Sequence, residues 1–383
     1  MTTPPPPPPG SIPPPGGSQP PYGGGPGGFS GPGGQPQGWQ PPLPAAKRGN
    51  SWKWALGGVA LVAVIGVTAA VTLSVADKGG DGGPGSPTAV PPTATAGSGQ
   101  HPDIASANDT GPVAVILDDP SCATQSPVII AYANRTKNGW EKRDPALPAT
   151  EWTPEIRAQY EAVGQAFRDA ADQLIPSAKL TPHRVMRELY EQFIAYARAY
   201  ADTIPNYSPI NNQLALVAVN AADAIDRICA AIGYGSAAAR GPLVPALPTP
   251  SEVAPARDPA DAQKLLAEPN PVCPEWNAAM AQYFASSEAW NATSPDTPGV
   301  EWSPEQRKIN DEVVPVMRLL NTQLSALGRK SENPVLRDLA NLAVQYRKAY
   351  LEALPTYTPA DKYLVSAASR TASVVEFACK ALG

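Results

Sequence analysis

Cysteine and histidine are the residue types in this 383-residue sequence that could hold a metal ion or support redox chemistry. The four cysteines are Cys122, Cys229, Cys273 and Cys379. They form no C-x-x-C pair and have no histidine close by in the sequence, whereas structural zinc sites need closely spaced ligands of these types. We therefore predict two disulfides in an oxidising compartment, and neither a metal ion nor a cofactor.

No catalytic motif stands out elsewhere in the chain. The sequence lacks the G-x-S-x-G elbow, the H-E-x-x-H zinc motif, the Walker loop, and a dinucleotide fingerprint placed between a strand and a helix. His183 lies near a predicted helix start, and its counterpart in the second half of the chain is Asn333, which favours a solvated surface histidine over a shared catalytic role. No pattern in the sequence places two carboxylates together in a cleft, so the sequence does not support a glycoside hydrolase activity. We predict that the protein is not an enzyme.

The second half of the chain repeats the first at an offset of 150 residues. Residues 151–157 (EWTPEIR) match residues 301–307 (EWSPEQR), and further identities continue to Gly233 and Gly383. The first cysteines of the two copies match at an offset of 151, so one residue has been gained or lost upstream. The sequence therefore contains two copies of a module of about 110 residues, an ordinary domain size.

Each copy is predicted to be all-α, with four helices. Apolar residues recur every three or four positions after Pro154, Pro182 and Pro209, which predicts one apolar face on each of three helices. A hydroxyl residue precedes the proline at helix starts such as Thr153-Pro154, as expected for an N-cap followed by proline at the first helical position. An earlier helix is expected after the first cysteine of each copy. Pro315 is expected to kink the second copy's counterpart of the Pro154 helix.

The expected topology also predicts which cysteines pair. In an up-down-up-down bundle the start of the first helix and the end of the fourth lie at the same end. Cys122 and Cys229 occupy these places in the first copy, and Cys273 and Cys379 occupy them in the second. Of the three pairings that four cysteines allow, we favour the two that each close one repeat, whereas a bond between Cys229 and Cys273 would imply swapped modules.

Aromatic residues recur just before helix starts in both copies. They are Trp152, Trp302, Tyr207 and Tyr357. We expect them to fold back over the bundle ends, as the residue of a hydrophobic staple does. The alternative is that they line a groove for a sugar or an acyl chain together with arginines, because aromatic faces and guanidinium donors suit such ligands. The arginines concerned are Arg157, Arg187, Arg307 and Arg337.

An uncharged apolar run at residues 54–76 predicts a transmembrane helix, since its 23 residues can cross a hydrocarbon layer of about 30 Å. Lys47, Arg48 and Lys53 precede it, so the N-terminus is predicted to be cytoplasmic and the C-terminal region extracytoplasmic. A cleaved signal peptide is the alternative, but the run is longer than the usual apolar region of such peptides.

Small residues at Gly66, Ala70 and Ser74 form a stripe on this helix that could pair two copies of the chain in a homodimer. The net charge is −5, and residues 1–76 carry three basic and no acidic residues, so the remainder carries 26 basic against 34 acidic residues, or −8. An acidic exterior argues against nucleic-acid binding.

Proline and glycine cluster outside the two repeats. The predicted organisation is a disordered cytoplasmic tail at 1–50, a transmembrane helix at 51–76, a flexible stalk at 77–110, a first helical module at 111–233, a linker at 234–268 with a short helix near 261–267, and a second helical module at 269–383.

This order of parts, from a tail such as PPPPPPGSIPPPGG to the cysteine-paired exterior, resembles the proline-rich single-pass membrane proteins of mycobacteria and related actinobacteria. The resemblance covers mainly residues 1–110 and implies a plasma-membrane location that faces the cell envelope. We predict an exterior protein-interaction or scaffold region. The alternative is a binding or sensing domain for an envelope lipid or glycan, which should show a continuous apolar pocket, whereas a scaffold should show filled cores and an exposed apolar patch.

Overall fold

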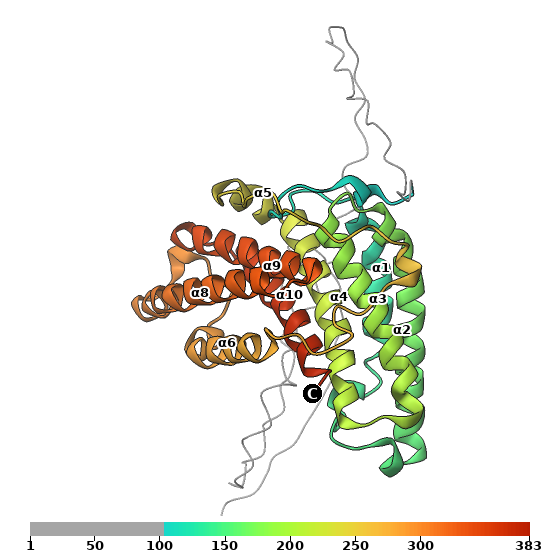
Figure 1. Ribbon diagram of the computed structural model, residues 1–383. Coiled ribbons are helices and arrows are strands. Elements are labelled where there is room, and N and C mark those ends of the chain that lie inside the picture. The colour runs from blue at the N-terminus through green and yellow to red at the C-terminus, as the bar shows by residue number, and fades with distance from the viewer. Residues whose placement is uncertain (1–102) are drawn as a thin grey trace, which may run out of the picture. The chain divides into compact units, whose positions relative to one another are not determined.

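The computed structural model describes residues 103–383, and every regular element in that part of the chain is a helix (Figure 1). The predicted all-α fold is confirmed for these residues. The predicted cytoplasmic tail, the transmembrane helix with its small-residue stripe, and most of the stalk fall at residues 1–102, outside the described part. Between residues 103 and 383, no helix is both long enough and apolar enough to cross a membrane.

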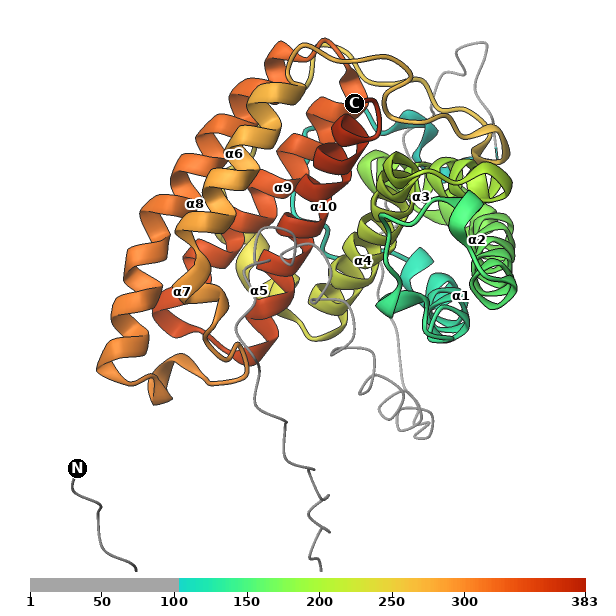
Figure 2. The same cartoon turned by 90° about the horizontal axis from the view of Figure 1, so that it is seen from below.

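Each repeat folds into a bundle of four helices. The last three are those that the apolar spacing predicts, and the first is the earlier helix expected after the first cysteine. The first bundle consists of α1 (Ser121–Arg135), α2 (Pro154–Leu180), α3 (Arg184–Thr203) and α4 (Asn212–Gly233). The second consists of α6 (Cys273–Ser286), α8 (Pro304–Lys330), α9 (Pro334–Ala353) and α10 (Lys362–Lys380), with the short α7 (Glu288–Asn291) after α6. Consecutive long helices pack together, and the first helix of each bundle also contacts the fourth (Figure 2).

The N-caps of the second helices form as predicted. Thr153 Oγ1 accepts a hydrogen bond from the backbone N–H of Ile156 at 3.3 Å, and Ser303 Oγ accepts one from Gln306 at 3.1 Å. α8 continues through Pro315 to its end at Lys330, so this proline does not end the helix. The kink expected there stays a prediction.

The fourth helices begin slightly later than their prolines predict. Pro209 and Pro359 start short 3₁₀ turns, η6 (Pro209–Asn211) and η11 (Pro359–Asp361), and α4 and α10 follow them. A capping box accounts for the tight start. In the second copy Asp361 Oδ2 accepts hydrogen bonds from both the backbone N–H and the hydroxyl of Thr358, at 2.8 and 3.0 Å.

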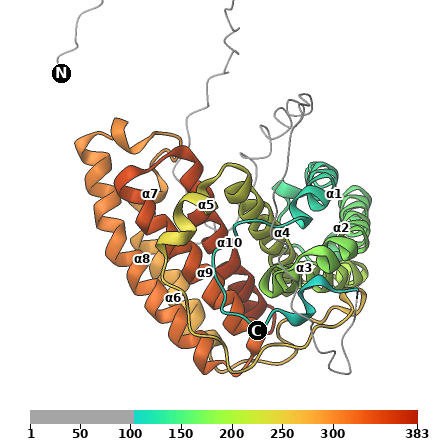
Figure 3. The same cartoon turned by 90° about the horizontal axis from the view of Figure 1, so that it is seen from above.

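The two bundles belong to one compact unit and pack through their fourth helices. Among the described residues, α4 and α10 make the most extensive helix–helix contact, and α3 also meets α9 (Figure 3). Arg370 Nη1 donates to Asn220 Oδ1 at 3.2 Å, and these two residues are counterparts in the repeat. A residue that touches its own counterpart lies near a two-fold axis, so the bundles pack much as the subunits of an isologous dimer do.

The linker at 234–268 packs onto the bundles. It begins with α5 (Ser236–Arg240) and the turn η7 (Gly241–Leu243), and Arg240 Nη2 pairs with Asp361 Oδ2 of the second bundle at 3.1 Å. The prediction of a short helix near 261–267 is wrong, because only the turn η8 (Pro259–Asp261) forms there and an irregular segment follows it. The adjacent Leu265 and Leu266 are both buried in this irregular segment.

The chain approaches α1 through a lead segment, defined here as residues 103–120. Its first eight residues belong to the predicted flexible stalk, but they contain the turn η2 (Ala105–Asn108) and the buried Ile104 and pack against the first bundle. The rest runs in an irregular, mostly extended course with Val115 and Ile116 buried. The backbone N–H of Ile116 donates to the hydroxyl of Tyr346 on α9 at 3.3 Å. The lead segment therefore contacts both bundles.

Candidate functional site

The four cysteines form two disulfides, each within one bundle. Cys122 is bonded to Cys229 and Cys273 to Cys379, with Cα atoms 5.3 Å apart in both pairs. Each bond joins the start of the first helix to the end of the fourth. Within residues 103–383, no group of three or more His, Cys, Asp or Glu side chains is placed to hold a metal ion.

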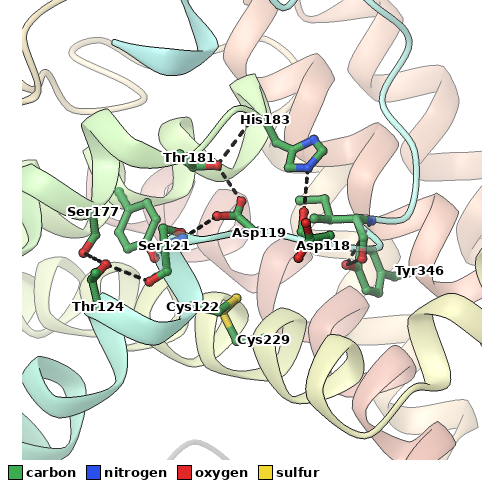
Figure 4. The surroundings of a disulfide bond; sticks show 12 residues. Asp118, Asp119, Ser121, Cys122, Thr124, Ser177, Thr181, His183, Cys229 and Tyr346 are labelled. Atoms are coloured by element: carbon green, nitrogen blue, oxygen red, sulfur yellow. Dashed lines mark hydrogen bonds between the residues drawn. A yellow bond between two sulfur atoms is a disulfide. The ribbon is translucent and has the colours of Figure 1, made fainter. Parts of the chain in front are cut away.

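Polar contacts around the first disulfide fasten the lead segment to the turn between α2 and α3 (Figure 4). Asp119 is buried, and its carboxylate accepts hydrogen bonds from the Ser121 N–H at 2.9 Å and the Thr181 hydroxyl at 2.5 Å. His183 Nε2 donates to the carbonyl of Asp118 at 2.9 Å. His183 is half-buried rather than a fully solvated surface residue, and it occupies the N-cap position of α3, as its counterpart Asn333 does in α9.

The repeated tryptophans close the bundle ends in the same way in both copies. Trp152 Nε1 donates to the carbonyl of Leu147, and Trp302 Nε1 donates to that of Thr297, both at 2.9 Å. Each acceptor lies in the loop that leads from the first helix to the second, five residues before the tryptophan. The indole N–H groups are therefore used in fixing these loops.

The repeated tyrosines fasten the same loops from the other side. Tyr207 and Tyr357 are buried, and their hydroxyls donate to the carbonyls of Pro145 and Pro295, at 2.9 and 2.6 Å. The carbonyl of Tyr357 also accepts from the N–H of Gly299, where an added Cβ would lie only 3.3 Å from Tyr357 atoms. The aromatic residues thus make internal contacts at the bundle ends.

Of the four arginines of the proposed groove, Arg157 lies over the Trp152 ring, with its guanidinium carbon 5.6 Å from the ring centroid. Arg157 donates to the carbonyl of Ala149 at 2.9 Å, whereas Arg307 is exposed. Arg187 lies at the opposite end of α3, where it pairs with Glu191 at 2.7 Å, and Arg337 donates to the backbone of Glu252 in the linker. The structure therefore brings Trp152, Tyr207 and Arg157 together at the end of the first bundle, and Trp302 with Tyr357 in the second, but Arg187 and Arg337 lie elsewhere.

A buried ionic cluster, which the sequence analysis missed, joins the lead segment to both bundles. Arg184 of α3 is only 2% exposed, and its Nε donates to Asp338 Oδ2 of α9 at 2.7 Å. Its backbone N–H donates to Asp109 Oδ2 at 2.7 Å, and its Nη2 donates to the carbonyl of Gly111 at 3.3 Å. This one guanidinium connects three parts of the chain.

A second carboxyl group, Glu188, belongs to the same cluster. It is 0% exposed, and neither of its oxygens has a hydrogen-bond partner. Burial, and then the negative charge of Asp338, raise the pKa of Glu188 well above its usual value. Glu188 and Asp338 are counterparts in the repeat, but the offset of 150 only relates the two positions, and the contact between α3 and α9 is what brings them near one another.

The core of the second bundle contains a buried arginine. Arg347 of α9 is 0% exposed, and its Nη1 donates to Asn321 Oδ1 at 3.1 Å. Its Nε and Nη2 have no hydrogen-bond partner. Burial lowers the pKa of this guanidinium. The counterpart position in the first bundle is Ala197.

Comparison with known proteins gives the family. Residues 104–383 match the family described as mycobacterial ESX-1 associated protein. The chain belongs to this family. It is 51% identical to an uncharacterized protein of Mycolicibacterium smegmatis (strain MKD8) over 354 residues, which cover 92% of each chain. No solved structure matches it.

The family match agrees in part with the resemblance drawn from the sequence. The ESX-1 associated family is mycobacterial, as the resemblance implies. The match begins at residue 104, however, so it rests on the lead segment and the bundles and not on the proline-rich tail. The family match therefore covers the lead segment, the two bundles and the linker between them.

The two bundles and the linker border a cleft of about 500 Å³. It is bordered by α3, the linker and the turn between α8 and α9, and most of the side chains that line it are polar or charged. These are Glu191, Gln192, Arg257, Asp258, Asp261, Gln263, Lys264, Ser331, Glu332 and Asn333. The surface that these residues present to the cleft is nonetheless mostly apolar, so the lining combines charged groups with apolar surface.

The second bundle exposes one large apolar side chain on α6 and one on α8. Phe284 is 43% exposed and Leu319 is 46% exposed. A hydrogen bond between Gln282 and Gln323 at 3.4 Å joins the two helices. Phe284 follows Gln282 by two residues and so lies on roughly the opposite side of α6 from this contact. The counterpart of Leu319 in the first bundle is Asp169, which forms an ion pair, so only the second bundle is apolar at this position.

Proposed function

We propose that this chain is a non-enzymatic, membrane-anchored protein of the mycobacterial envelope, and that its helical region binds protein partners of the ESX-1 secretion system. Membership of the ESX-1 associated family supports the link to secretion. The two disulfides support an oxidising, extracytoplasmic location for the bundles. The apolar run at 54–76 supplies the predicted single membrane span, with the N-terminus in the cytoplasm.

The interaction role is supported by the way the two bundles are held together as one compact unit. Arg184 ties the lead segment to α3 and α9, and Arg240 ties the linker to the second bundle. The repeated aromatic residues are engaged within the bundle ends, which leaves the outer helix faces as the surfaces available for partners. A partner that covers Leu319 or Phe284 would remove exposed apolar surface from water.

Site-specific photo-crosslinking in mycobacterial membranes tests the proposal. A photoreactive residue is placed at Leu319 of the full chain, and the matched control carries it at Asp169 of the first bundle. We expect position 319 to give a crosslink to a protein of the ESX-1 system and position 169 to give little or none, and we expect L319D to lose the partner. Equal crosslinking at both positions, or unchanged ESX-1 secretion after deletion of the chain, would contradict the proposed role.

A polar ligand in the cleft between the bundles is the second candidate function. The combination of charged groups and apolar surface suits an envelope glycan, because a sugar ring presents both hydroxyl groups and apolar C–H faces. Native mass spectrometry of the full chain extracted from mycobacterial membranes tests this function. A co-purified glycan whose binding weakens in K264A would support it, and a ligand-free chain that still captures its protein partner would exclude it.

A further inference from the structure

Arg347 is a buried cation that lacks a counter-ion among the described residues. Asn321, a neutral amide, accepts one of its hydrogen bonds, and the ring of Tyr283 lies with its centroid 5.4 Å from the guanidinium carbon. The Tyr283 hydroxyl is itself buried and has no hydrogen-bond partner. The group therefore has neutral neighbours, and two of its three nitrogens are left without an acceptor.

The first bundle shows what this core contains when no arginine is present. There Tyr132, the counterpart of Tyr283, packs edge-on against Phe167 and Phe193, with ring centroids 5.0 and 5.8 Å apart. Ala197 occupies the counterpart position of Arg347 and is fully buried. This core is apolar and is filled by aromatic rings.

The second bundle has exchanged those rings for polar groups. Met317 and Ala343 replace the two phenylalanines, and Arg347 and Asn321 replace two buried alanines. Ala343 lies one turn before Arg347 on α9, so the arginine side chain takes up space that Phe193 fills in the first bundle. The two copies share a fold, so the fold itself does not require the buried charge.

The charge must be compensated, since an arginine stays protonated even when burial lowers its pKa. Leaving an ion unpaired in a protein interior costs several kcal/mol. The N–H groups of Arg347 that lack an acceptor, together with the Tyr283 hydroxyl, can donate hydrogen bonds to an anion. We propose that the core of the second bundle binds one small inorganic anion or carboxylate of the size of chloride or formate, held by Arg347 with Asn321 and Tyr283. This inference is independent of the proposed partner role.

Anion-dependent stability of the full chain in detergent tests the site. Thermal unfolding is measured in chloride, formate and gluconate at equal ionic strength, because gluconate is too large for an enclosed core. For a dissociation constant of about 10 mM, 100 mM of a bound anion lowers the unfolding equilibrium constant about tenfold. We expect chloride or formate to raise the midpoint relative to gluconate in the wild type and in K348M, which removes a neighbouring cation on α9, but not in R347M.

Anomalous scattering gives a test that needs no variant. Crystals of the full chain grown with bromide should show an anomalous peak beside the Arg347 guanidinium. Response to formate and not to chloride would identify a carboxylate site and would still support the proposal. Equal stability in all three anions, with no bromide peak at Arg347, would overturn it, as would an anion effect that R347M retains.

Discussion

Replacement of Glu188 by glutamine tests the buried cluster that joins the bundles. The groups that act on Glu188 are Arg184, Arg187 and Glu191 on its own helix and Asp338 on α9. Asp338 Oδ2 receives a hydrogen bond from Arg184 at 2.7 Å, whereas neither Glu188 oxygen has a partner. The proton of the carboxyl pair therefore resides on Glu188, which is neutral in the folded protein over a pH range in which the unfolded chain has lost that proton.

The sign of the pH dependence follows from this difference in protonation. Because the folded state holds a proton that the unfolded state releases, the stability from Glu188 is complete below the unfolded pKa of about 4.3 and is lost as the pH rises toward the folded pKa. One group contributes a slope of up to about 1.4 kcal/mol per pH unit in this range. The E188Q side chain stays neutral, so this variant loses that slope and becomes more stable relative to the wild type as the pH rises.

The assay is chemical denaturation of the full chain in detergent at intervals from pH 5 to pH 8. The quantity of interest is the free energy of unfolding of E188Q minus that of the wild type, because other titrating groups largely cancel in this difference. E161Q serves as the control, since Glu161 is exposed on α2. If the E188Q difference stays constant across the whole pH range, Glu188 is ionised in the folded protein and our reasoning about the cluster is wrong.

Three further changes test the contacts that hold the bundles. The double variant C273S/C379S should lose about 4 to 5 kcal/mol of unfolding free energy, because the bond closes a loop with a sequence separation of 106, and a loss under 1 kcal/mol in chemical denaturation would contradict this. R184M should cost about 3 to 5 kcal/mol because it leaves the buried Asp338 without its partner, and R184M/D338L should recover most of that loss in a double-mutant cycle. Y357F should cost about 1 kcal/mol in the same assay, since it removes the hydrogen bond to the loop before α8, and a neutral result would show that ring packing alone fixes this loop.

The helices could be predicted because their signals are local. The three- and four-residue spacing of apolar side chains marks the faces of α2, α3 and α4, and hydroxyl-proline pairs mark helix starts. The short helix near 261–267 failed for a tertiary reason. Its two leucines are buried by surfaces far away in the sequence, and the carbonyl of Leu265 accepts a hydrogen bond from Asn333 at 3.0 Å.

The candidate residues could be located from the sequence, but their contacts could not. Trp152 and Tyr207 were found because the repeat preserves them, yet only the structure shows their hydrogen bonds to loop carbonyls. Arg184 has no arginine counterpart in the second copy, where Pro334 stands, so the repeat gave no reason to single it out. Its partners lie 75 and 154 residues away in the chain.

The sequence by itself determined the duplication, the helical content and the modules that the cysteines close, because periodicity and repetition are properties of the chain. Tertiary structure alone decided that α4 and α10 join the bundles and that Glu188 faces Asp338. It also decided that Arg347 is enclosed without a counter-ion. The physical reason is that burial and charge pairing depend on which segments, far apart in the sequence, pack against each other. A local pattern of residues does not specify this packing.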